Sequence, residues 1–545
     1  MRNILRHGRL QTTRWSDKLS RVHEFTDQER GLLGRYVTNL DGRVFALRNL
    51  PEVVRGALFS RYSRTEKSLR RVLLDEFLAE PDAGIAPGPP GEHRDQLVAS
   101  DRAEDFYRRI LVGYGDDSVA ELAGAHLAVE RVSTLAAKAL EDSRIGISPL
   151  EKSTRYVRFD RRDPEGRFPY HRGPELDHPA YEPAMDALFG TYSELVMPLT
   201  EAVRSRYPLE EGETERAWKS ATRARALDLL RGLLPAATRT NLGLYGNGRA
   251  FEYLLTKLSA SELPECRQLA VEMHDELSQA IPAFVRRALD ERYGAPAAAR
   301  LVQARQRASR FAPSPTHAPA EVGVKLIDHD PGAERKVVAA ALFPYSDASL
   351  EELGGMEVDA AAVLDALLGD RGNRRHRVPR ALEQASYLFE ITASFATYRD
   401  LQRHRMLTQE RQPLGTWLGY DVPPELDGYG LAGTAARALE AAGSAHRELE
   451  QALGTAVAQY AVPLGYRLRW YFRVSLREVF HLCELRTTPQ GHADYRHIAQ
   501  EMFRRVQEVH PRLAGYARFV DLSPAEELER RASERRIDQK LQSLR

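Results

Sequence analysis

The chain has 545 residues, of which 43% are hydrophobic and 28% are charged, as is usual for folded globular proteins. Its 78 Lys and Arg residues against 77 Asp and Glu residues give a formal net charge of +1. This balance excludes a global electrostatic attraction to nucleic acid or to an anionic membrane, so any anion site must be local. The length corresponds to roughly three to four domain equivalents, which two large domains or a duplicated unit would satisfy.

The sequence contains few signals of a cellular compartment or of a metal site. No apolar run approaches the length of a membrane-spanning helix and no signal-peptide pattern is present, so we expect a cytoplasmic protein with no membrane partner. Two cysteines, Cys266 and Cys483, provide neither a disulfide framework nor a zinc set, and we interpret them as packing residues. No His-Glu-x-x-His or Cys-x-x-Cys spacing occurs, so no metal is expected.

The first part of the chain begins with a polar arm, residues 1–41. Alternation followed by helical periodicity predicts a short strand leading into a helix over 44–63. A turn or cap signal at 113–118 opens a run without Gly or Pro from Ala125 to Ile145, which predicts a long helix.

A segment rich in tyrosine and proline follows and is expected to be irregular. A helix is predicted for Ala217 to Leu234, ended by Pro235, and a further helical pattern surrounds Ala250 to Leu289. Residues 294–320 are rich in Ala, Pro and Arg and lack an apolar period, so we interpret them as a linker between domains.

Beyond this linker the same order of elements returns. Pro235 and Arg249 correspond to Pro463 and Arg477 at one constant offset (463 − 235 = 477 − 249). A run without Gly or Pro from Arg380 to Gln412 answers the first long run and is also predicted to be helical. An apolar stripe at helical spacing within it is expected to be core: Leu382, Ala385, Phe389, Ala393 and Ala396. The ordered series indicates an internal duplication.

Two short motifs carry the chemistry. Arg403, His404 and Arg405 can all donate charge-assisted hydrogen bonds, which makes an anion clamp, although a basic triplet on a helix is also typical of a solvated face. The first half contains Ser153-Thr-Arg-Tyr156. A serine there can equally cap a local turn.

Together these motifs resemble the signature of the flavin-dependent thymidylate synthase family (ThyX), which is Arg-His-Arg, seven residues, then Ser with Arg-Tyr close behind. Here the signature is split between the halves. The second half has Arg403 to Arg405 but reads Pro413-Leu-Gly-Thr416 where the serine motif belongs, and the first half has the serine motif but reads Glu141-Asp-Ser-Arg144 where Arg-His-Arg belongs. The triplet alone is weak, because it recurs at Arg375-His-Arg377.

The resemblance implies an α+β fold of two tandem ThyX-like domains, each with a mixed or antiparallel sheet packed with long helices. The expected divisions are an arm (1–41), a first domain with the Ser-x-Arg-Tyr half (42–293), the linker (294–320), a second domain with the Arg-His-Arg half (321–515) and a charged C-terminal helix (516–545).

The resemblance also assigns residues. The family's substrate arginine four residues before a proline is matched by Arg231 and replaced by Gln459 in the second half, and its pyrimidine-polarising arginine is matched by Arg486 but absent from Leu255-Thr-Lys-Leu258. Substrate binding is assigned to Glu151, Ser153, Thr154, Arg155, Tyr156, Arg231, Asp400, Arg403 and Arg486, of which Arg486 and Ser153 are assigned to catalysis. Cofactor binding is assigned to Arg403, His404, Arg405, Ser118, Asn247, Arg249 and Arg477.

The implied reaction is C5 methylation of dUMP to dTMP with FAD as cofactor and with methylenetetrahydrofolate and NADPH as co-substrates. One composite site would combine both halves, and a homodimer would rebuild the family's four-domain assembly. Asp400 stands where the family usually has Gln, and Asp116 replaces a common His, so a related modification of another pyrimidine nucleotide, such as hydroxymethylation, stays open. A non-catalytic flavin- or nucleotide-binding paralogue is a further alternative, and a nucleic-acid binder is a weaker one.

Overall fold

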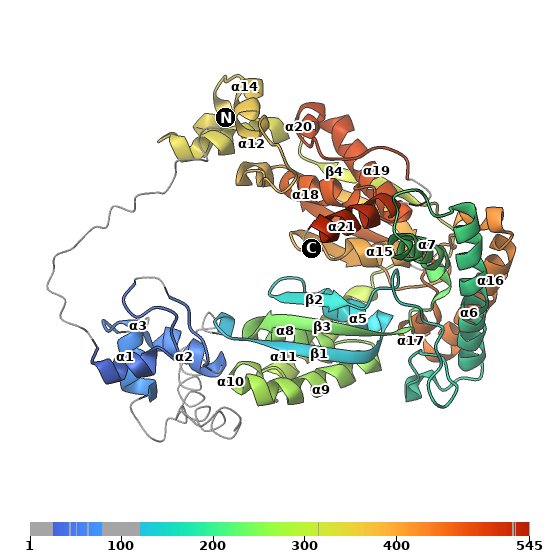
Figure 1. The fold of residues 1–545 in the computed structure, drawn as a ribbon, viewed down its shortest axis with the longest axis horizontal. Coiled ribbons are helices and arrows are strands. Elements are labelled where there is room, and N and C mark those ends of the chain that lie inside the picture. Colours follow the sequence, from blue (N-terminus) through green and yellow to red (C-terminus); the bar gives the residue numbers. More distant parts are fainter. Residues whose placement is uncertain are drawn as a thin grey trace. The chain divides into compact units, whose positions relative to one another are not determined.

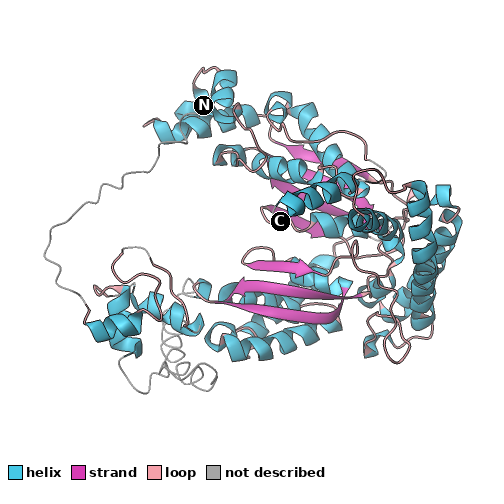
Figure 2. Ribbon diagram, in the orientation of Figure 1, coloured by secondary structure: helices cyan, strands magenta, loops and turns pink. Residues whose placement is uncertain are grey.

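The computed structural model describes residues 25–42, 45–50, 52–62, 65–78, 120–313, 316–525, 528 and 530–543. The chain forms two compact units, one of residues 1–123 with 281–283 and one of residues 124–280 with 284–545. Figure 1 shows the elements in chain order and Figure 2 separates helices from strands. Within the part of the chain that is described, no helix is both long and apolar enough to cross a membrane.

The described part of the smaller unit is helical. It contains α1 (Asp27–Leu33), α2 (Glu52–Tyr62), α3 (Leu69–Val72) and the π-helix η1 (Leu73–Leu78). The helix predicted within 44–63 is α2. The strand predicted before it is reduced to a single bridge between Val37 and Leu47.

The first half of the larger unit contains a three-stranded antiparallel sheet. Its strands are β1 (Gly124–Ser133), β2 (Ile147–Glu151) and β3 (Arg239–Asn247), in the order β1-β3-β2. Alternate residues of β3 are buried, as a half-buried strand requires. Helices α8 (Gly248–Ser259) and α9 (Pro264–Ala280) contact the sheet and lie next to it in Figure 1.

The second half repeats this design with one more strand. Strands β4 (Gly323–His329), β5 (Ser386–Ser394), β6 (Leu407–Arg411) and β7 (Arg467–Ser475) form an antiparallel sheet in the order β4-β5-β7-β6. Helices α18 (Leu476–Arg486) and α19 (Ala493–Val509) contact it. The α+β class is therefore confirmed, with two antiparallel sheets packed with helices.

The constant offset predicted between the halves is visible in the backbone. Strand β3 corresponds to β7, and η6 (Arg231–Leu233) corresponds to η10 (Gln459–Ala461), at the same spacing (467 − 239 = 459 − 231). The two halves meet at a bridge between Pro235 and Pro463. Four backbone hydrogen bonds there form two equivalent pairs, Ala236 N to Val462 O with Leu464 N to Leu234 O, and Ala237 N to Tyr460 O with Gly465 N to Gly232 O. The duplication is thus arranged about a local pseudo-twofold axis.

The two long helices predicted from runs without Gly and Pro are wrong. Residues 125–145 form β1 and the short helix α5 (Thr134–Glu141), and residues 380–412 form η8 (Arg380–Gln384), β5, α15 (Phe395–Leu401) and β6. In β5 the buried residues Tyr387, Phe389 and Ile391 alternate, so a strand period runs through the stripe that also fitted a helix. The stripe from Leu382 to Ala396 is buried, as predicted for core.

The predicted helix at 217–234 is α7 (Glu215–Leu230), continued by η6, and the helical pattern at 250–289 contains α8, α9 and α10 (Pro282–Val285). The segment expected to be irregular instead contains α6 (Tyr181–Arg206), which lies beside α16 (Ala432–Leu453). The segment interpreted as a linker contains α11 (Gly294–Ser309), which packs against α8.

The remaining elements complete the larger unit. They are η5 (Pro174–Leu176), α12 (Ala333–Leu342), η7 (Phe343–Tyr345), α13 (Leu350–Gly355), α14 (Ala360–Leu368), η9 (Pro424–Tyr429), α17 (Thr455–Ala458), α20 (Pro511–Gly515) and α21 (Arg531–Ser543). Within the segment expected to be a charged C-terminal helix (516–545), the structure has α21.

Candidate active site

The Arg-His-Arg residues follow α15 directly. Ser394 caps this helix by accepting a hydrogen bond from the Thr397 amide at 3.3 Å, and the helix ends at Leu401. Arg403 to Arg405 therefore form the turn that leads into β6, rather than the end of a long helix. A turn lets neighbouring side chains point in different directions, so the three residues can serve different contacts.

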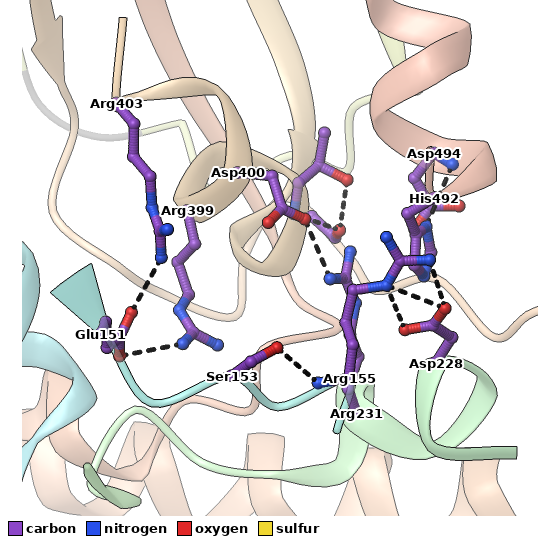
Figure 3. A network of polar contacts seen from close by, with 12 residues as sticks. Glu151, Ser153, Arg155, Asp228, Arg231, Arg399, Asp400, Arg403, His492 and Asp494 are labelled. Carbon is purple, nitrogen blue, oxygen red and sulfur yellow. Dashed lines mark hydrogen bonds and ion pairs between the residues drawn. The ribbon is translucent and has the colours of Figure 1, made fainter. Parts of the chain in front are cut away.

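Arg403 contacts carboxylates of the first half. Its Nη2 lies 3.4 Å from Oε2 of Glu151 and 3.7 Å from Oε1 of Glu141. Arg399, one helical turn earlier, donates to Glu151 Oε1 at 3.1 Å (Figure 3). The same Glu151 accepts from Lys138 Nζ at 2.7 Å. We name these five residues the interface ion cluster.

The electrostatics of the interface ion cluster are set by mutual neutralisation. Burial by itself raises the pKa of Glu151, but Lys138 and Arg399 outweigh it and lower that pKa to about 2. Burial likewise lowers the pKa of Arg403, and Glu141 and Glu151 reverse the effect and raise it. The other four residues of the cluster are buried, and buried charges are held only when they are paired, whereas the Arg403 side chain is 38% exposed. Arg403 is thus fixed by the first half of the chain.

Two more predicted substrate residues meet across the halves. Arg231 donates from Nη1 to Oδ2 of Asp400 at 2.9 Å, and Arg155 binds both oxygens of Asp228 at 2.6–3.0 Å (Figure 3). Burial raises the pKa of Asp400 but Arg231 and Arg155 outweigh it, so the pKa lies well below its usual range. Ser153 Oγ accepts from the Arg155 amide at 3.2 Å.

One donor in this group is unused. Arg231 is buried, and its Nη2 has no hydrogen-bond partner among the described residues. Burying an unpaired guanidinium N–H is costly, so this atom points to an acceptor that the protein does not supply itself. An oxygen of an anionic ligand would satisfy it.

A separate cavity of about 550 Å³ lies within the second half. Its lining includes four residues assigned above to cofactor binding and the polarising arginine: Arg403, His404, Arg405, Arg477 and Arg486. The preceding segment adds Arg374, His376 and Arg377. Lining carboxylates come from Glu383, Glu478 and Glu484, so guanidinium groups outnumber them. Such a surface suits a polyanionic ligand.

The segment at Arg374 to Arg377 was missed by sequence reasoning, which treated Arg375-His-Arg377 only as a chance recurrence of the triplet. The signal was present in the sequence, since three arginines and a histidine stand close together immediately before the run that forms β5. Nothing in the sequence alone showed that this segment and Arg403 to Arg405 would line one cavity.

His404 is held between two partners. Its Nδ1 lies 2.7 Å from Oε1 of Glu478, and its Nε2 accepts from Nε of Arg486 at 2.9 Å. Burial, followed by Arg486 and His481, lowers the pKa of His404 well below its usual range. Burial raises the pKa of Glu478 to about 7. His404 is therefore neutral, with its proton on Nδ1.

His404, Glu478 and His481 bring possible metal-ligand atoms within 4.8 Å of one another. A cation on Nδ1 of His404 would force the ring proton onto Nε2, where Arg486 now donates. It would also sit in a cavity lined with arginines. The group is therefore a poor fit for a metal.

Other predicted residues have different surroundings. Asn247 caps α8, since its Oδ1 accepts from the Ala250 amide at 2.8 Å. Arg249 is exposed and does not line the cavity. Thr154 is buried, whereas Tyr156 is 46% exposed and contacts Arg530. Ser118 lies outside the described residues, as do Asp116 and most of the N-terminal arm.

Across the halves, β2 of the first half and the turn before it contact the Arg-His-Arg turn. Arg144 donates to the carbonyl oxygen of His404 at 2.6 Å, and Arg405 donates to Ser148 Oγ at 2.8 Å. The first half thus contributes both the carboxylates that hold Arg403 and contacts to its two neighbours.

Cys266 and Cys483 are buried and reduced, and burial raises the pKa of the Cys266 thiol to about 12. They are packing residues, as predicted.

Comparison with known proteins gives two kinds of match. The model of a family described as thymidylate synthase complementing protein matches residues 80–283 and 325–512, that is, two successive segments. A UPF0159 protein of Chlamydia muridarum is 44% identical over 518 residues, which are 93% of this chain and 97% of the relative. UPF0159 protein Ta1429 of Thermoplasma acidophilum is 34% identical over 500 residues, with coverage of 86% and 95%.

A flavin-dependent thymidylate synthase of Geobacter sulfurreducens is 28% identical over 210 residues. That alignment covers 87% of the relative but 37% of this chain. A single-unit relative aligned with one half of a duplicated chain gives this kind of coverage. The duplication also explains why the family model matches this chain in two successive segments.

Proposed function

The chain belongs to the thymidylate synthase complementing protein family, and from that premise we propose that it is a flavin-dependent enzyme that transfers a one-carbon unit to C5 of a pyrimidine nucleotide, with dUMP converted to dTMP. Methylenetetrahydrofolate would supply the carbon and NADPH the reducing equivalents. The observation that carries the proposal is the meeting of Arg403 and Asp400 with Glu151 and Arg231. These residues join the two incomplete halves of the family's signature.

The cavity in the second half supports a flavin dinucleotide. Its arginine-rich lining offers more guanidinium donors than carboxylates, which fits a diphosphate group. Arg403, His404, Arg405 and Arg477 would hold FAD there, and the flavin would supply the redox chemistry of the reaction. A neutral His404 can donate only from Nδ1, so its contact with Glu478 keeps the imidazole oriented in the cavity.

Substrate handling falls to both halves. The unpaired Nη2 of Arg231 offers a hydrogen bond to the nucleotide phosphate, and Arg155 is held in place for the same role by Asp228. Charge-assisted hydrogen bonds of this type contribute about 1.5–3 kcal/mol each when water is excluded. Arg486 would stabilise negative charge that develops on the pyrimidine ring, which makes C5 nucleophilic. Ser153 would position the nucleotide, and we assign it no role as a nucleophile, since no base stands beside it in the sequence.

One observation favours a second candidate, a flavin- and nucleotide-binding protein without the methyl transfer. Asp400 and Asp228 already neutralise Arg231 and Arg155, so the phosphate site is less cationic than a bare pair of arginines. A modification of a different pyrimidine nucleotide is compatible with the same feature.

We further propose that the chain forms a homodimer, because two duplicated chains would supply the four family units of the assembly that the resemblance implies. Size-exclusion chromatography with light scattering measures this directly. A dimer mass is expected, and a stable monomer would contradict the proposal.

The proposed reaction is tested by the absorbance of the purified protein. We expect flavin absorbance that is bleached by NADPH and restored when methylenetetrahydrofolate and dUMP are added together. A flavin that is reduced but not reoxidised by that pair would contradict the methylation. A flavin that NADPH never reduces would favour the binding protein.

A further inference from the structure

The C-terminal helix α21 lies outside the residues that the family model matches, which end at 512. It docks on α7 and on the turn before it, in the first half. The docking is ionic. Arg531 pairs with Glu210 and Glu213 at 2.6 and 2.8 Å, Arg535 pairs with Glu210 at 2.5 Å, and Asp538 pairs with Arg216.

Arg530, which immediately precedes α21, reaches the predicted nucleotide segment. Its guanidinium carbon lies 4.4 Å from the centroid of the Tyr156 ring, and its Nη2 donates to the Tyr156 hydroxyl. Tyr156 is adjacent to Arg155, the predicted phosphate ligand. The docked helix α21 therefore holds the preceding cation, Arg530, against the segment that resembles the family's Ser-x-Arg-Tyr motif.

Arg530 differs from the other arginines of this region in its partners. Arg155 and Arg231 each have a carboxylate partner, Asp228 and Asp400. For Arg530, no carboxylate lies within ion-pair distance in the described part of the chain. Its Nη1 is buried and has no hydrogen-bond partner there. A cation with an unused buried donor, held against Tyr156 next to Arg155 in the sequence, offers the positive charge that the two neutralised arginines lack for an anionic ligand.

We propose that Arg530 is a further substrate-binding residue, which takes the phosphate monoester of the pyrimidine nucleotide, and that α21 is the element that positions it. The inference rests on the proposed function, since it assigns a residue to the same nucleotide site. The carboxylates on Arg155 and Arg231 hold those side chains in place, and Arg530 supplies the net positive charge that they no longer provide.

The test is calorimetric binding of dUMP and of the uncharged nucleoside deoxyuridine to the full chain and its variants. Arg530→Ala is expected to weaken dUMP binding about tenfold and to leave deoxyuridine binding unchanged, because only dUMP carries the phosphate. Arg530→Lys keeps the charge and should remain within about threefold of wild type. Asp538→Asn loosens α21 and should weaken dUMP binding about threefold.

Arg536→Ala is the matched control, because Arg536 is exposed on the same helix and its Nε donates only to the Ala532 carbonyl of that helix. It should leave both affinities unchanged. Wild-type affinity for dUMP in Arg530→Ala, or an equal loss of both ligands, would overturn the role of Arg530. If, in that case, Arg155→Ala still weakens dUMP binding without weakening deoxyuridine binding, the proposed function stands. A wild-type chain that binds neither ligand would overturn both.

Discussion

The first and second halves of the larger unit share the order of their central elements but differ in chemistry. After their cap residues Asn247 and Ser475, helices α8 and α18 follow the same course, at the offset that relates the two halves. The second half places Glu478, His481 and Arg486 at the third, sixth and eleventh positions after the cap. The first half has apolar or weakly polar residues at these positions: Ala250, Tyr253 and Leu258. The cavity with its arginines belongs to the second half alone.

The opposite asymmetry holds at the interface between the halves. Glu151 on β2 pairs with Leu242, and Arg411 on β6 pairs with Trp470, so the two residues occupy equivalent places. In an assembly of two copies of the second half, Arg411 would occupy the position of Glu151, the carboxylate that now pairs with Arg399 and Arg403. Like charges in a buried contact are unfavourable. The difference shows that each half has become specific for the other, which a fused chain permits.

The largest effect is expected at Lys138. Lys138 stands five residues after the cap of α5, and Arg399 has the equivalent position five residues after the cap of α15. Lys138 is fully buried and binds two carboxylates. Lys138→Met leaves these carboxylates short of one cation, so unfolding in urea should show a loss of about 3 kcal/mol or more. Lys325→Met is the control, since Lys325 is exposed and lies 3.9 Å from Glu390, and its change should stay within about 0.5 kcal/mol. Equal effects would contradict the role of the interface ion cluster.

The next effect concerns Arg231, the arginine that the proposed function assigns to substrate binding. Arg231→Gln introduces the residue that the second half has at Gln459. It should leave the half-buried Asp400 without its ion-pair partner and destabilise the fold by about 2 kcal/mol, and it should weaken dUMP binding by tenfold or more.

Adding Asp400→Asn removes the unpaired charge. The double variant should therefore recover most of the stability without recovering dUMP affinity. Urea unfolding and calorimetry separate the two results. Recovery of both properties together would mean that Arg231 acts only on stability.

The last effect is a pH dependence caused by Glu478. The first half has Ala250 at the equivalent position and so lacks a titrating group there. The pKa of Glu478 is raised to about 7 from 4.5, so its contribution to stability is full below pH 4.5 and is lost as pH rises through 7. His404 acts in the opposite sense, because its lowered pKa gives stability that is present above pH 6.5 and lost as pH falls. The two contributions offset each other between pH 5 and 6.5.

Glu478→Gln removes one of these contributions. Relative to wild type, the free energy of unfolding of this variant should rise between pH 5 and 6.5 by up to about 1.4 kcal/mol per pH unit. Urea titrations at several pH values measure the difference. The groups that face Glu478 in the structure are His404, His481, Arg144, Arg477 and Arg486. Identical slopes in the two proteins would show that Glu478 does not titrate in this window.

The repeat was predictable from sequence because it leaves a fixed offset. Pro235, Pro463 and the helix caps keep the same spacing between the halves even where the side chains have changed. The strands β1 and β5 were not predictable in the same way, because each runs directly into a helix, and the buried residues then fit a period of two and a period of three to four together. The helix α6 was missed because its prolines lie within its first turn and at Pro198, inside the helix.

The contacts between the halves were predictable where the family motif survives and not where the partners are new. The joining of Arg403 and Asp400 with Glu151 and Arg231 followed from the split motif. The carboxylate partners Asp228 and Glu141 did not, because ion pairs between residues far apart in sequence leave no local pattern. Arg530 and the arginines at 374 and 377 could not be assigned either, because the sequence does not show that Arg530 meets Tyr156 or that 374 to 377 lines one cavity with Arg403 to Arg405.

The central claim is that one site draws on both halves. Release of tritium from C5-labelled dUMP in the presence of FAD, NADPH and methylenetetrahydrofolate measures it directly, with Arg403→Ala and Arg155→Ala compared with wild type. We predict turnover by the wild type and a loss of at least tenfold in each variant, since each arginine comes from a different half. Activity that survives either substitution at the wild-type level would contradict the composite site.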